Sequence, residues 1–93
     1  MTLERSMRID NKHGLHLRAA AMVARTAADF DADIKVCYNS KTADAKSTVG
    51  LITLGAPNAG TILVQACGDD AHSALEAISN LLQGEDFICQ PAA

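Results

Sequence analysis

A histidine and an arginine stand two positions apart where a polar loop gives way to a run of helix-forming residues. The loop 11–14 precedes His16, and Arg18 falls in the first turn of the expected helix. Unpaired backbone N–H groups and the positive end of the helix dipole meet at such a position, which disfavours an imidazolium cation and favours an anion attached to the ring. Arg18 can hold phosphate oxygens through charge-assisted hydrogen bonds. The pair therefore indicates a histidine that accepts a phosphoryl group.

Two other histidines give alternatives to this interpretation. A histidine beside a glycine in a loop is often only a solvated turn residue or a cap, so the spacing alone leaves the role of His16 open. His13 lies in the same loop before the helix and is expected to be an exposed side chain, although it is the rival acceptor. His72, in the first turn of the last expected helix, is expected to lie on the surface.

Composition and charge exclude several classes of protein. The 93 residues, of which 48% are hydrophobic and 20% charged, suffice for one folded domain. The net charge of −3 comes without a Lys/Arg-rich run, and no apolar run approaches the length of a membrane span. Cys37, Cys67 and Cys89 are widely spaced without a metal-site pattern. We therefore expect a cytoplasmic protein with free thiols that binds no metal, nucleic acid or membrane.

The periodicity of the apolar residues predicts four strands and three helices. Period-two alternation predicts strands over 3–9, 34–38, 41–45 and 61–66, and helical spacing predicts helices over 17–29, 48–54 and 71–83. Ser47 is expected to cap the short helix, and Asp69 or Asp70 the last one. Asn39 and Ser40 form the hairpin turn, whose type stays open because Ser40 is a weaker turn residue than glycine where φ must be positive.

The order of these elements predicts a two-layer α+β domain. One sheet with the helices on a single face would bury every apolar stripe of the sequence. We expect this domain over residues 1–84. The segment 85–93 shows no periodicity and is expected to be a C-terminal tail.

The histidine segment resembles a known family signature. Residues 14–20, Gly-Leu-His-Leu-Arg-Ala-Ala, are similar to the active-site motif G-[LI]-H-x-R-P-A of the HPr phosphocarrier family. Lys46 and Ser47 before a hydrophobic short helix resemble its second hallmark, and the similarity extends over residues 4–83. The resemblance implies an open-faced sandwich, in which a four-stranded antiparallel sheet of order 1-4-2-3 carries three helices on one face.

The resemblance also implies a reaction in the phosphoenolpyruvate-dependent phosphotransferase system. Enzyme I would place a phosphoryl group on Nδ1 of His16, and a IIA domain would receive it. Arg18 and the backbone N–H groups of Leu17 and Arg18 would stabilise the phosphate. Such a transfer is mostly positioning and charge stabilisation. A monomeric carrier with a covalent phosphohistidine is therefore expected, rather than an autonomous enzyme, and it needs no cofactor.

Regulation is the second implication. Ser47 matches the serine that an ATP-dependent HPr kinase/phosphorylase modifies, while the alternative is a serine that only caps its helix. Leu17, Val49 and Leu51 would form an apolar docking patch for partners, although burial of these side chains would be equally ordinary. A competing hypothesis is an HPr-like regulatory module that binds a transcription factor or an enzyme according to Ser47 phosphorylation, with His16 secondary.

Two residues depart from the family motif. The proline that follows the arginine is Ala19 here, so a residue whose missing N–H suits a first helical turn has been lost, and the helix start is expected to be looser. Leu17 is bulky and apolar where the family has a small or polar residue. This change is expected to alter the choice of partner.

Overall fold

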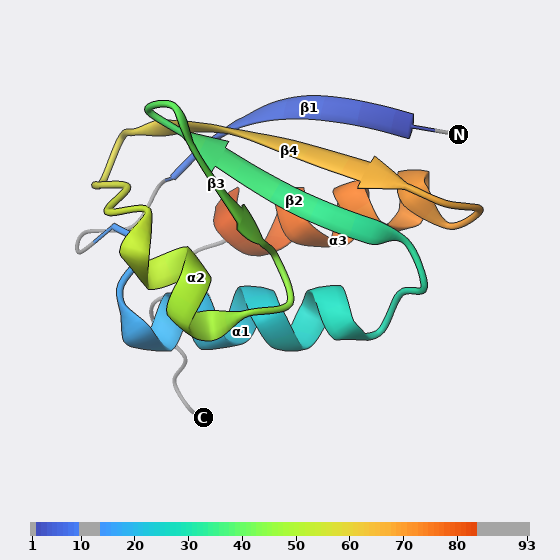
Figure 1. Ribbon diagram of the computed structural model, residues 1–93, viewed down its shortest axis with the longest axis horizontal. Coiled ribbons are helices and arrows are strands. Elements are labelled where there is room, and N and C mark those ends of the chain that lie inside the picture. Colours follow the sequence, from blue (N-terminus) through green and yellow to red (C-terminus); the bar gives the residue numbers. More distant parts are fainter. Residues whose placement is uncertain (1, 10–13, 84–93) are drawn as a thin grey trace.

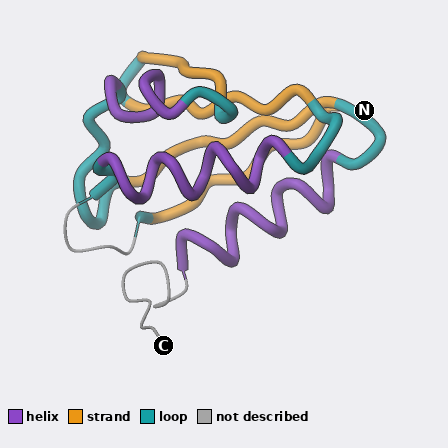
Figure 2. The backbone as a smooth tube through the Cα atoms, turned by 90° about the horizontal axis from the view of Figure 1, so that it is seen from below, coloured by secondary structure: helices purple, strands orange, loops and turns teal. Residues whose placement is uncertain are grey.

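Seven elements form one sheet and one layer of helices in the computed structural model, which describes residues 2–9 and 14–83. They are β1 (Thr2–Arg8), α1 (Leu17–Ala28), β2 (Asp33–Tyr38), β3 (Lys41–Asp44), α2 (Thr48–Thr53), β4 (Thr61–Cys67) and α3 (Ala71–Gln83). The strands pair antiparallel in the order β1-β4-β2-β3. All three helices lie on the same side of the sheet (Figures 1 and 2). The predicted α+β sandwich and its strand order are confirmed.

Alternation along the strands decides which side chains face the helices. In β4 the apolar side chains of Ile62, Val64 and Ala66 are buried, and Thr61 and Cys67 at its two ends are exposed. The same period-two pattern predicted this strand from the sequence. The sheet therefore presents one apolar face to the helices and one polar face to solvent.

Arg5 interrupts the apolar face of β1, and the structure shows how it is accommodated. Its guanidinium pairs with the Glu76 carboxylate of α3, with a nitrogen–oxygen distance of 3.0 Å and both side chains partly exposed. β1 lies at the edge of the sheet, so the arginine side chain can reach solvent there.

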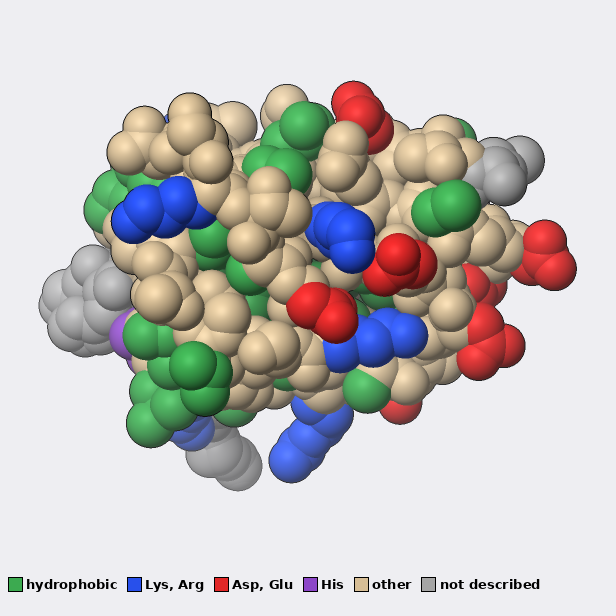
Figure 3. All heavy atoms as spheres, viewed as in Figure 1, with side chains coloured by type: hydrophobic (Ala, Val, Ile, Leu, Met, Phe, Trp, Pro, Cys, Tyr) green, Lys and Arg blue, Asp and Glu red, His purple; other side chains and the backbone are tan. Residues whose placement is uncertain are grey.

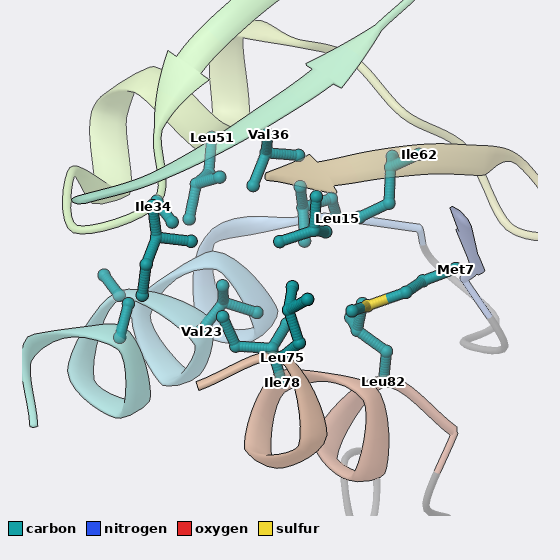
Figure 4. Close-up of a cluster of buried hydrophobic side chains, with 14 of the residues drawn as sticks. Met7, Leu15, Val23, Ile34, Val36, Leu51, Ile62, Leu75, Ile78 and Leu82 are labelled. Atoms are coloured by element: carbon teal, nitrogen blue, oxygen red, sulfur yellow. The ribbon is translucent and has the colours of Figure 1, made fainter. Parts of the chain in front are cut away.

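The core between the sheet and the helices combines branched side chains with many alanines (Figure 4). The largest fully buried side chains are Met7, Ile9, Ile34, Val36, Leu51, Val64, Ile78 and Leu82. The apolar side chains whose helical spacing predicted the two long helices are buried, namely Ala20, Val23, Ala24 and Ala27 in α1 and Ala71, Ala74, Leu75, Ile78 and Leu82 in α3. Because alanine is small, the helices can approach the sheet closely without leaving voids.

The carboxylate of Asp70 has a different role from the predicted one. Its two oxygens accept the backbone N–H groups of Asp31 and Ala32, at 2.8 and 2.9 Å. Asp70 lies directly before α3, but its side chain binds the loop after α1 instead of the first turn of its own helix. These hydrogen bonds join the connection between α1 and β2 to the connection between β4 and α3, which are far apart in sequence.

The β2–β3 turn adopts positive φ at both central residues. Asn39 has φ 53° and Ser40 has φ 71°, between the paired residues Tyr38 and Lys41. This is the requirement of a type I′ hairpin turn, whose twist matches that of the strands. Asparagine tolerates the left-handed region, whereas the Cβ of serine makes that conformation unfavourable.

Replacing Ser40 with glycine should therefore stabilise the protein. We expect Ser40→Gly to raise the free energy of unfolding by about 0.5 to 1 kcal/mol, because removal of the Cβ relieves the left-handed conformation by more than the added chain entropy costs. Urea denaturation measures the change. Asn39→Gly is the matched control and should give the smaller gain; a loss of stability in Ser40→Gly would contradict the assigned turn.

Candidate functional site

The loop that carries His16 is held against the connection between α2 and β4. The Leu15 N–H donates to the Ala56 carbonyl oxygen at 2.9 Å, and the Leu15 side chain is buried in the core (Figure 4). Gly14 has φ +70°, and a Cβ at this position would lie 2.6 Å from the Ala56 oxygen and 2.8 Å from the Cα of Pro57. Glycine is thus required here both by the backbone conformation and by the close approach of the two backbone segments.

His16 is the N-cap residue of α1. Its backbone is extended, with φ −83° and ψ −177°, and its Nδ1 accepts the N–H of Arg18 at 3.2 Å. Its carbonyl oxygen accepts the N–H of Ala20 at 2.8 Å, which begins the helical hydrogen bonding. A ring nitrogen that accepts a hydrogen bond carries a lone pair, so the neutral ring has its proton on Nε2. Nδ1 therefore faces the N-terminus of α1 with its lone pair.

The sequence left a capping role for His16 only as an alternative, and the structure shows that the ring does cap α1. The sequence places His16 at a helix start, but histidine is not among the residues preferred as caps, which are serine, threonine, aspartate and asparagine. The available signal was that none of these four residues lies between Gly14 and the first apolar residues of the helix.

Arg18 brings a cation to the positive end of α1. Its side chain is exposed, and the first turn of the helix contains no acidic residue. No Asp or Glu of residues 2–9 or 14–83 lies within ion-pairing distance of its guanidinium. A cation in this place is unfavourable by itself and becomes favourable beside an anion. The surroundings of Arg18 therefore suit a guanidinium that turns onto an anion at His16.

Ser47 caps α2, as predicted. Its Oγ accepts the N–H of Gly50 at 3.1 Å, and the residue is partly buried. The preceding Lys46 donates its backbone N–H to the Asp44 carboxylate at 3.0 Å and its Nζ to the Phe30 carbonyl oxygen at 2.9 Å. The second bond joins the start of α2 to the end of α1, and the two helices pack against each other (Figure 1).

Three large apolar side chains are exposed on these two helices, and we call them the apolar patch. They are Leu17 at the start of α1, 65% exposed, and Val49 and Ile52 of α2, 76% and 38% exposed. Figure 3 shows hydrophobic side chains gathered at this end of the molecule beside a histidine, with the acidic side chains of that view lying elsewhere. The patch therefore offers an apolar surface adjacent to the candidate site.

The prediction that Leu51 belongs to this surface was wrong. Its side chain is fully buried in the core (Figure 4). Residues three apart share a face of a helix, so Val49 and Ile52 point outward together. Leu51 lies between them in sequence and faces the sheet. Ile52 is therefore the exposed apolar residue that accompanies Val49 in the apolar patch.

Several other predictions concern residues away from this site. His72 is exposed on α3, with its Nε2 4.0 Å from the Glu76 carboxylate, and Cys37 and Cys67 are free thiols. In the part of the chain that the structure describes, no cluster of three or more His, Cys, Asp or Glu side chains could hold a metal ion. None of its helices is long and apolar enough to cross a membrane. His13, Cys89 and the predicted tail 85–93 lie outside the described residues.

Comparison with known families shows which family the chain belongs to. The family model for the phosphotransferase-system HPr component phosphorylation site matches residues 3–84. The chain belongs to the HPr family. It is 42% identical over 83 residues to phosphocarrier protein NPr of Shewanella violacea, which covers 89% of this chain and 91% of the relative. The family predicted from the histidine motif is confirmed.

Solved HPr structures have the same fold. The phosphocarrier protein HPr of Bacillus anthracis superposes with a TM-score of 0.84 at 33% identity, covering 88% of this chain and 98% of that one. HPr-C-His of Thermoanaerobacter tengcongensis gives a TM-score of 0.84 at 36% identity, covering 87% of this chain and 91% of that one. This chain is therefore a phosphocarrier-family domain of the phosphotransferase system.

Two glycines test the contact that holds the histidine loop. Gly14 and Gly55 have nearly equal φ values, +70° and +68°, but a Cβ at Gly55 would meet nothing within 4 Å. Gly14→Ala should therefore lower the free energy of unfolding by about 1 to 3 kcal/mol more than Gly55→Ala, since only the former adds a backbone clash to the left-handed strain. Urea denaturation of both variants measures the difference. Equal losses of stability would show that the loop at Gly14 can move freely away from the segment Ala56–Pro57.

Proposed function

We propose that this protein carries a phosphoryl group on Nδ1 of His16, accepting it from enzyme I and passing it to a IIA domain, as a monomer in the cytoplasm. The supporting observation is the position of Nδ1, which faces the N-terminus of α1 and lies 3.2 Å from the backbone nitrogen of Arg18. Helix N-termini favour bound anions. Membership of the HPr family supports the same chemistry.

The transfer exchanges one phosphorus–nitrogen bond for another. The lone pair on Nδ1 of His16 attacks the phosphorus of a donor phosphohistidine, and the electron pair of the broken bond stays on the donor nitrogen. The Nε2 proton remains on the accepting ring. No other reactant is consumed, so the protein's own contribution is orientation and charge stabilisation.

The backbone at the start of α1 is suited to both states of the ring. In the free protein the Arg18 N–H donates to Nδ1. Once phosphorus occupies that nitrogen, a phosphoryl oxygen takes over as acceptor for this N–H, and the Leu17 N–H and the Arg18 guanidinium provide further donors. The change replaces one weak cap by charge-assisted hydrogen bonds with little movement of the chain.

Partner docking is assigned to the apolar patch of Leu17, Val49 and Ile52. An apolar surface beside a reacting group can be buried by a partner, which removes water from the phosphoryl group and aligns donor and acceptor. The exposed cation Arg25 lies two helical turns after Arg18 on α1. A partner with an apolar contact surface and acidic residues at its edge therefore fits best.

The direct test is phosphorylation with enzyme I and phosphoenolpyruvate. His16→Ala should abolish the incorporation of the acid-labile phosphoryl group, because the accepting nitrogen is removed. His72→Ala, which removes an exposed histidine on α3, should still incorporate one group per chain. Labelling and mass spectrometry measure both. If His16→Ala were still labelled, the acceptor would be another residue, and His13 would be the first to examine.

Arg18 provides a second test of the same site. Arg18→Ala should keep the fold and slow phosphorylation by roughly tenfold to a hundredfold, the loss of one or two hydrogen bonds to a charged group. Arg18→Lys keeps the charge without the planar fork, so its phosphorylation rate should lie between the rates of the unmodified protein and of Arg18→Ala. Rapid-quench kinetics give the rates. An unchanged rate in Arg18→Ala would remove the guanidinium from the mechanism.

Regulation through Ser47 is the second candidate function. We propose that an HPr kinase/phosphorylase modifies its hydroxyl, which caps the same helix that carries Val49 and Ile52. Phosphate at a helix start is compatible with the fold, but it adds a dianion next to the apolar patch. The modified surface would bind enzyme I less well, and it could be recognised by a transcription regulator through the new charge.

The charge effect at Ser47 can be separated from its capping role. Ser47→Asp and Ser47→Asn both keep a side-chain cap and differ by one charge. The Asp variant should be phosphorylated by enzyme I about fivefold more slowly at low salt, and the gap should shrink as salt screens the charge. Initial rates at two salt concentrations measure this. Equal rates for the two variants would leave Ser47 as a helix cap alone.

A further inference from the structure

The first turn of α1 contains a backbone donor that the family motif does not provide. In the motif the residue after the arginine is proline, which has no N–H, whereas this chain has Ala19. Ala19 is the third residue of α1, and the hydrogen bonding along the helix begins only with the N–H of Ala20, which reaches the His16 carbonyl oxygen at 2.8 Å. The Ala19 N–H therefore belongs to the first-turn groups that have no carbonyl acceptor within the helix.

The position of this N–H relative to His16 follows from cap geometry. An N-cap side chain reaches the backbone N–H of the second or third helical residue. Here Nδ1 of His16 binds the second, Arg18, at 3.2 Å. The third, Ala19, is its immediate neighbour on the same helical turn, and the Ala19 side chain is fixed in the core with no exposed area. By the same cap geometry, both N–H groups are within reach of a group attached to Nδ1.

We infer that the Ala19 N–H donates a hydrogen bond to the phosphoryl group carried on His16, as an additional donor made available by the loss of the motif's proline. This inference rests on the proposed phosphorylation of Nδ1. A phosphoryl group presents three acceptor oxygens. The Leu17, Arg18 and Ala19 N–H groups, together with the Arg18 guanidinium, supply donors for all of them.

The added donor shifts an equilibrium. A hydrogen bond to a charged group that forms only in the phosphorylated state stabilises that state relative to the free histidine. Phosphoryl transfer from enzyme I then favours this protein more than it would with a proline at residue 19. The bond does not exist before phosphorylation, so it contributes nothing to the stability of the free protein.

The test replaces this single N–H without changing the side chain. Cys37 allows the full chain to be assembled by native chemical ligation from synthetic residues 1–36 and recombinant residues 37–93. One version carries lactic acid in place of Ala19, which turns the amide N–H into an ester oxygen. The matched control has the same ester at Ala21, an exposed residue of α1 away from the ring. A third version is the all-amide protein.

The readout is the ratio of phosphorylated to free protein at equilibrium with enzyme I at a fixed ratio of phosphoenolpyruvate to pyruvate. The ester at residue 19 should lower this ratio about tenfold, and the ester at residue 21 should leave it at the all-amide value. In the ¹⁵N-labelled recombinant protein, the Ala19 amide proton should move downfield on phosphorylation.

The outcomes separate this inference from the proposed function. A protein that is phosphorylated on His16 but shows the same ratio for the residue 19 ester and the all-amide chain overturns the inference and leaves the carrier function standing. An Ala19 amide proton that does not respond to phosphorylation overturns it as well. An all-amide chain that accepts no phosphoryl group on His16 overturns both.

Discussion

The close backbone contact between Gly14 and the segment Ala56–Pro57 sets the geometry of the whole site. A Cβ at Gly14 would lie 2.6 Å from the Ala56 oxygen, so the two connections touch backbone to backbone. One connection leads from β1 into α1, and the other leads from α2 into β4. Because β1 and β4 are paired neighbours in the sheet, this contact fixes where α1 begins relative to α2. The position of His16 and of the apolar patch beside it both follow from that registration.

His16 combines two functions that are usually separate in proteins, since the same nitrogen caps a helix and is the proposed acceptor. A cap is worth about 1 kcal/mol to a helix. This interaction would be lost when phosphorus binds Nδ1, but the phosphoryl oxygens would replace it with hydrogen bonds roughly twice as strong as neutral ones. The start of α1 is therefore satisfied in both states. A serine or aspartate cap would stabilise the free helix equally well but would give it no nitrogen nucleophile at that position.

The sequence predicted the elements of the fold far better than it predicted individual contacts. Long stripes such as those of α1 and α3 have enough turns to show their period, so their buried faces were predicted correctly. The six residues of α2 are too few for that, and the choice between Leu51 and Ile52 as the exposed residue depends on how the helix sits on its neighbours. The capping role predicted for the Asp70 side chain was wrong for a related reason. Its hydrogen-bond partners, Asp31 and Ala32, are 39 and 38 residues away in sequence, and local capping rules carry no information about them. The strand order came from the family motif rather than from periodicity.

The charges at the start of α1 explain why Arg18 and His16 occur together there. A helix is usually stabilised by acidic residues in its first turn, yet α1 has none there and carries Arg18 instead. In the free protein this arrangement is mildly unfavourable, and the phosphoryl dianion proposed on His16 would turn the same charges into stabilising partners. A carrier must also release its group, because each donor that stabilises the phosphorylated state makes the next transfer less favourable. In the proposed carrier, donors at the start of α1 would therefore set how the phosphoryl group divides between the proteins before and after this one. Backbone changes as small as the presence or absence of one N–H can tune that balance while the fold and the reacting atoms stay the same.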